Sequence, residues 1–81
     1  MHMKIQILFF GATSSMVDER RIELELSDGA TADNVFEKVK VRFPALRSLN
    51  LLLSIDQTYA TGNETIHDGN ELAIFTAVSG G

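Results

Sequence analysis

One stretch of this 81-residue chain has the spacing of an α-helix, and strand-like segments flank it on both sides. Val35, Val39 and Phe43 recur at every fourth position, which gives one apolar helical face. Thr31 stands where an N-cap is expected, and Pro44 ends the pattern because proline cannot continue a helix. The sequence therefore predicts a single amphipathic helix between Thr31 and Pro44, enough to cover one face of a sheet.

The remaining apolar segments have the patterns of β-strands. Residues 4–10 and 71–78 are apolar on both faces over much of their length, which is typical of central strands. Residues 21–26 alternate strictly between apolar and charged, which predicts a half-exposed strand. Two shorter strands are expected at residues 51–55 and 58–60.

The order of these elements predicts a mixed sheet in which the first and last strands are adjacent and parallel. This is the β-grasp arrangement of ubiquitin, an α+β fold with one main covering helix. We expect residues 11–18 to form a connecting loop. The start at His2 and Met3 resembles a cloning remnant, and we leave it out of the expected fold. A single domain is expected over residues 1–81, ending in a flexible Gly-Gly tail at 79–81.

Composition excludes several classes of function. The chain has no cysteine, so no thiolate can act as a nucleophile, a zinc ligand or a persulfide carrier. Its formal net charge of −4 and scattered basic residues argue against binding to nucleic acid. No apolar run reaches the roughly 18–20 residues that span a membrane, and the start lacks a secretory signal, so we expect a cytoplasmic protein.

Conventional catalytic and metal-binding patterns are missing from the sequence. His2 and His67 are far apart and lack companion ligands, so we expect no metal site. Ser14 and Ser15 lack a plausible base, so we expect them to be loop residues. The glycines form no phosphate-binding motif, and we expect no bound cofactor.

The C-terminal sequence Val78-Ser79-Gly80-Gly81 is the strongest candidate for a functional site. Because glycine lacks a Cβ atom, such a tail can thread a narrow channel and bring its carboxylate to the catalytic groups of a partner. That carboxylate is inert until it is activated, for instance as an acyl-adenylate, and it can then accept sulfur or an amine.

The last strand carries a second candidate site. Alternation directs Leu72, Ile74 and Val78 toward the helix and directs Phe75 to the opposite face, near Leu8 or Phe10. An apolar patch on the open face of a one-helix sheet is typical of a binding surface. We therefore expect these three residues, Phe75, Leu8 and Phe10, to form a partner interface; the alternative is that a loop shields Phe75.

Three motifs give the sequence a family resemblance: the "LFF" near the start, the "DGNE" turn before the last strand and the "VSGG" at the end. Together they resemble the small subunit of molybdopterin synthase, and the resemblance extends over essentially the whole chain. It implies a sulfur carrier that is not catalytic alone. An activating enzyme related to ubiquitin E1 would use ATP to adenylate Gly81, which then becomes a thiocarboxylate. The tail would enter the large subunit and deliver sulfur to a cyclic pterin in molybdenum cofactor biosynthesis.

The sequence departs from that family at two places. Thr76-Ala77 stand where members often have two prolines, and Ser14-Ser15-Met16 stand where an Arg-Glu pair is common. Relatives with the same fold and a Gly-Gly end remain as alternatives, namely the thiamine-pathway sulfur carrier and protein modifiers that conjugate through the terminal glycine. A plain β-grasp interaction domain is a further alternative.

Overall fold

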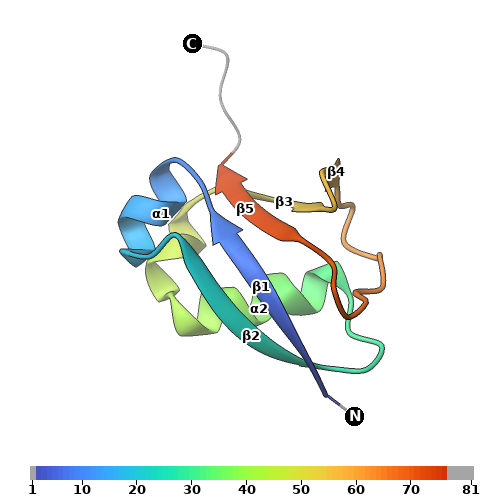
Figure 1. Ribbon diagram of the computed structural model, residues 1–81. Coiled ribbons are helices and arrows are strands. Elements are labelled where there is room, and N and C mark those ends of the chain that lie inside the picture. Colours follow the sequence, from blue (N-terminus) through green and yellow to red (C-terminus); the bar gives the residue numbers. More distant parts are fainter. Residues whose placement is uncertain (1, 77–81) are drawn as a thin grey trace.

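The computed structural model describes residues 2–76. Its elements are five strands, two α-helices and one 3-10 helix (Figure 1). In chain order they are β1 (His2–Phe9), α1 (Ala12–Val17), β2 (Arg21–Ser27), α2 (Ala32–Arg42), the 3-10 helix η1 (Pro44–Ser48), β3 (Leu51–Ile55), β4 (Thr58–Tyr59) and β5 (Leu72–Thr76).

The five strands form one mixed sheet in the order β2-β1-β5-β3-β4. β1 pairs antiparallel with β2 and parallel with β5, where Ile7 lies opposite Leu72 and Phe9 opposite Ile74. β3 pairs antiparallel with both β5 and β4. The predicted α+β β-grasp architecture, with its first and last strands adjacent and parallel, is confirmed.

Helix α2 crosses one face of this sheet, and the hydrophobic core lies between the two (Figure 1). Val35 and Val39 are fully buried on the predicted apolar stripe. The predicted N-cap is confirmed, because the Asn34 N–H donates to the Thr31 hydroxyl and the Thr31 N–H donates to the Asn34 side chain. The helix-facing side of the strands supplies the rest of the core, including Ile5, Ile7, Leu53, Leu72 and Ile74.

The expectation of a loop at residues 11–18 was wrong, because α1 forms there. Thr13 and Val17, one turn apart, are both buried. The Thr13 hydroxyl donates to the Phe10 carbonyl oxygen at 2.6 Å and lies 3.1 Å from that of Ile74. This contact connects α1 to β5, which lies far away in the sequence. The periodicity of a short segment could not reveal such a contact. A short 3-10 helix, η1, follows α2 and begins at Pro44.

Leaving His2 and Met3 out of the fold was also wrong. β1 begins at His2, which lies opposite Ser27, while Met3 lies opposite Leu26. The Met3 side chain is buried, at 8% exposure, on the same face as Ile5 and Ile7. The alternation of the first strand therefore extends to its start, and these residues lengthen the β1–β2 hairpin.

The loop before β5 supports the beginning of α2. The Ala32 N–H donates to the Glu64 carbonyl oxygen, and the Asp33 N–H donates to that of Gly62. The Glu64 carboxylate accepts the Thr61 N–H at 2.7 Å and the Gly62 N–H at 2.9 Å. These bonds, chiefly the one from the Thr61 backbone, lower the pKa of Glu64 from 4.5 to about 2, because they favour the ionised form.

Candidate partner-binding site

The sheet face opposite α2 carries a group of apolar side chains, which we call the open-face patch. The pairing register places its members on four strands and at the end of β1. They are Leu8, Phe10, Leu52, Tyr59, Ala73 and Phe75. Phe10 is 52% exposed and Tyr59 is 69% exposed, and the other four are half-buried. No helix of the described residues covers this face (Figure 1).

Phe75 lies at the centre of the open-face patch. Its neighbours on β5, Ile74 and Thr76, point the other way, and Ile74 is fully buried against the helix layer. Phe75 lies opposite Leu52 in the sheet, and its ring centroid is 5.8 Å from that of Tyr59. The predicted facing is therefore confirmed for Leu72, Ile74 and Phe75. The side chain is half-buried, and the ring of a strand residue, Tyr59, packs against it.

Leu8 and Phe10 join the patch from β1. Leu8 lies opposite Ala73 in the parallel β1–β5 pair, and the Phe10 N–H donates to the Ile74 carbonyl oxygen at 3.0 Å. These contacts bring the end of β1 beside the end of β5, as expected from the sequence. That Leu8, Phe10 and Phe75 bind a partner stays a prediction.

Sequence reasoning missed Leu52 and Tyr59. Alternation alone could have shown that Leu52 and Leu53 point to opposite faces of the sheet, and Leu53 is buried. Tyr59 was harder to foresee, because its place beside Phe75 depends on the tight turn between β3 and β4. Asp56 and Gln57 both have positive φ in that turn, at 49° and 71°, as in the hairpin turns that match strand twist.

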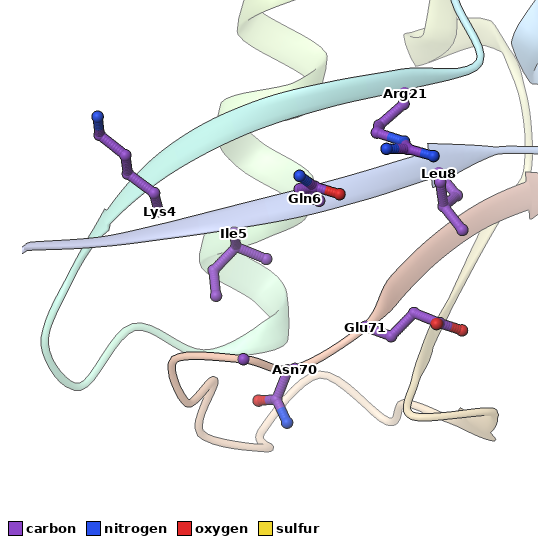
Figure 2. Close-up of a pocket in the computed structure, with 8 residues that line it drawn as sticks. Lys4, Ile5, Gln6, Leu8, Arg21, Asn70 and Glu71 are labelled. Carbon is purple, nitrogen blue, oxygen red and sulfur yellow. The ribbon is translucent and has the colours of Figure 1, made fainter.

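A shallow hollow of about 360 Å3 lies beside the patch, along β1 (Figure 2). Lys4, Gln6 and Leu8 of β1 line it, with Arg21 of β2 on one side and Glu71 on the other. The hollow is open and holds both signs of charge, with no nucleophile and base placed together. The lining therefore offers charged and amide groups beside the apolar patch.

Two of the polar residues that the sequence singled out make local hydrogen bonds, Ser14 through its side chain and His67 through its backbone. The Ser14 hydroxyl donates to the Gly11 carbonyl oxygen, and the His67 N–H donates to the Asn70 side chain. Across residues 2–76, no three metal-ligating side chains come together. No helix in that range is long and apolar enough to cross a membrane.

The predicted tail site, Val78-Ser79-Gly80-Gly81, lies outside the described residues. The end of the strand that leads into it, β5, is among the described residues. β5 ends at Thr76, opposite Leu51 of β3. This is the end of the sheet at which β1 also ends, so the open-face patch adjoins the segment that leads to the tail.

The fold and the uncovered sheet face define a ubiquitin-like β-grasp protein. A putative molybdopterin converting factor subunit 1 from Pyrococcus furiosus superposes with a TM-score of 0.87 at 19% identity, covering 94% of this chain and 99% of that one. The small archaeal modifier protein 1 of H. volcanii gives 0.85 at 19% identity over 94% and 99% of the two chains. The ubiquitin of Caldiarchaeum subterraneum gives 0.67 at 27% identity, with full coverage of both.

Sequence comparison narrows this class. The ThiS family matches residues 7–81, and the chain belongs to that family. The molybdopterin synthase sulfur carrier subunit of Haemophilus influenzae is 33% identical over 81 residues, covering 95% of this chain and 99% of that protein. The subunit of the same name from Mycobacterium tuberculosis is 29% identical over 82 residues, covering 98% and 99%.

Proposed function

We propose that this chain is the sulfur carrier subunit of a molybdopterin synthase. The observation that carries the proposal is the near full-length similarity to proteins of that name, at 33% and 29% identity, together with membership of the ThiS family. The expected compartment is the cytoplasm. The open-face patch supports a carrier role in a second way, because a carrier has to bind its partner proteins and exposed apolar patches are typical of binding surfaces.

The reacting group in this proposal is the Gly81 carboxylate. An activating enzyme related to ubiquitin E1 binds ATP, and the carboxylate oxygen attacks its α-phosphorus, releasing pyrophosphate and forming an acyl-adenylate. Sulfide from a sulfur donor then attacks the acyl carbon, so that a C–S bond forms, the C–O bond to AMP breaks and a thiocarboxylate is left. The absence of cysteine is consistent with this chemistry, in which the sulfur travels on the chain end. Val78, Ser79 and Gly80 would thread the channel of the partner.

The open-face patch is the proposed docking surface for the large subunit of the synthase. Phe75 stands at its centre with the ring of Tyr59 beside it, and aromatic side chains supply much of the binding energy at such centres. Docking on this face would hold the end of β5, and therefore the start of the tail, next to the large subunit. There the thiocarboxylate would donate its sulfur to the cyclic pterin precursor.

Intact mass spectrometry tests the chemistry directly. The protein is incubated with ATP, a sulfur donor and the activating enzyme, and the expected product has one oxygen replaced by sulfur. The matched control carries an uncleaved tag after Gly81, which converts the carboxylate into an amide and should abolish the reaction while the fold persists. Full sulfur transfer by the tagged protein, or an untagged protein that stays unmodified, would contradict the proposal.

The same experiment distinguishes a second candidate function. The 27% identity to the Caldiarchaeum subterraneum ubiquitin over the whole chain favours a protein modifier as the alternative. A modifier would join Gly81 to lysine side chains of other proteins and give adducts of higher mass. A sulfur carrier gives the thiocarboxylate without such adducts.

A further inference from the structure

Arg20 and Arg21 form the only adjacent pair of basic residues in a chain whose net charge is −4. Arg20 directly precedes β2, Arg21 begins it, and both side chains are exposed. Within residues 2–76, neither guanidinium makes an ion pair or a side-chain hydrogen bond. This holds although Asp18 and Glu19 are their neighbours in sequence. Both cations are therefore available to an outside group.

Arg21 lies beside the open-face patch, and Arg20, opposite Phe9 in the same ladder, lies next to it at the end of the sheet. Arg21 is directly opposite Leu8 in the β1–β2 pair, and Figure 2 shows its side chain beside that of Leu8. A second open hollow of about 360 Å3, at the end of β1, is lined by Arg20 and Arg21 together with Leu8, Phe10 and Ser14. Arg21 and Leu8 also line the hollow along β1, so the two hollows meet at these residues.

Covering the patch would change the surroundings of these cations. A partner that packs on Leu8 and Phe10 removes water from the same hollow that Arg20 and Arg21 line. A cation that loses water without gaining a hydrogen-bonded anion is costly, so the partner must supply acceptors there. Carboxylates suit this role, because the planar guanidinium can bind a carboxylate through two parallel hydrogen bonds.

Nucleic acid is a poorer match to this surface. Glu23 and Glu25 alternate with Arg21 on the same face of β2, and they would repel a continuous phosphate backbone. A protein can instead place single carboxylates opposite the arginines and apolar groups opposite Leu8 and Phe10. The arrangement of charge therefore favours a protein surface with an apolar centre and an acidic margin.

We propose that Arg20 and Arg21 bind carboxylate side chains of the partner that covers Leu8 and Phe10. This inference rests on the proposed function, in which that partner is the large subunit of the synthase. The inference adds to the proposed function that the partner surface is acidic where it meets the end of β1. It also assigns the arginines a distinct kinetic role, because charges at the margin of an interface chiefly accelerate association.

The test compares two double variants that each remove two positive charges. Arg20→Gln/Arg21→Gln alters the proposed site, and Lys38→Gln/Lys40→Gln alters α2 on the other side of the sheet. Binding to the large subunit is followed by surface plasmon resonance at about 0.05 M and about 0.5 M salt, conditions in which screening differs strongly. Thermal unfolding of both variants verifies that they are folded.

We expect the arginine variant to associate about tenfold more slowly than wild type at low salt, with a smaller difference at high salt. The lysine variant should associate at nearly the wild-type rate, and Arg21→Glu should be slower than Arg21→Gln. Equal rates for the arginine and lysine variants, with tight binding by wild type, would overturn this inference and leave the proposed function standing. A wild-type protein that does not bind the large subunit at all would overturn both.

Discussion

Ile74 and Phe75 are adjacent on β5, and their side chains point to opposite faces of the sheet. Truncating each of them to alanine should therefore affect different properties of the protein. Ile74 is fully buried between the sheet and α2. We expect Ile74→Ala to lower the free energy of unfolding by the upper half of the range of about 2–5 kcal/mol that such truncations cost, because a closely packed site cannot collapse around the cavity.

Phe75→Ala should cost less stability. Complete burial of a phenylalanine contributes about 1.5–3 kcal/mol, and a half-buried ring retains roughly half of that. The contact with Tyr59, itself 69% exposed, adds about 0.5 kcal/mol, the lower end for aromatic pairs. The expected loss of about 1–2 kcal/mol is well below the roughly 3–5 kcal/mol for a phenylalanine in a core.

Urea denaturation gives both stabilities, and titration of the large subunit gives both affinities. We expect Phe75→Ala to weaken binding by about tenfold or more, since central aromatic residues dominate many interfaces. Ile74→Ala should bind nearly normally once its folded fraction is taken into account. Should Ile74→Ala not fold, the milder Ile74→Val, with an expected cost of about 0.5–1.5 kcal/mol, replaces it. If Phe75→Ala loses as much stability as a core truncation and its folded fraction binds normally, the proposed docking face is wrong.

Three further predictions concern other parts of the chain. Gly80→Ala should reduce adenylate formation more than Ser79→Ala, because a side chain at Gly80 would collide with a channel built for backbone; equal, near-wild-type rates would contradict this. Because the pKa of Glu64 is lower in the folded state, its stabilising contribution is complete above pH 4.5 and is lost on acidification toward about 2. Urea midpoints measured across that range should fall less steeply for Glu64→Gln, and parallel curves would count against the assignment. Thr13→Val should lower the free energy of unfolding by about 1–3 kcal/mol, because it removes the donor to the Phe10 carbonyl oxygen; an unchanged urea midpoint would show that the bond contributes nothing.

Elements with regular periodicity could be predicted because their pattern is local. The stripe of α2 and the alternation of β2 are each visible within a dozen residues, and the near-continuous apolar segments correctly indicated the two adjacent inner strands. The turn at Asp56 and Gln57 was also predictable from composition. Aspartate is one of the residues that adopt the left-handed region in turns, and both Asp56 and Gln57 have positive φ there.

The missed elements depend on contacts between distant parts of the chain. The six residues of α1 are too few to establish a helical period, and the helix is fixed by the contact of Thr13 with the end of β5. Met3 was left out of the expected fold because His2 and Met3 resemble a cloning remnant, although Met3 continues the buried face of β1. The position of Tyr59 depends on how β3 and β4 pair, and the alternation of residues within one strand does not reveal that pairing.

The edges of the sheet help to explain why its face is the better binding surface. The Phe9 N–H donates to the Arg20 carbonyl oxygen, and antiparallel ladders bond at every second residue, so the backbone of Glu23 points away from β1. The Arg42 guanidinium donates to that outward carbonyl of Glu23 at 3.3 Å, which occupies an acceptor that an added strand would need. At the other edge, β4 has only two residues, too short a template for a strand from another chain. Strand addition is therefore disfavoured at both edges, whereas the open-face patch keeps its apolar side chains uncovered, and a partner gains most by packing on that face.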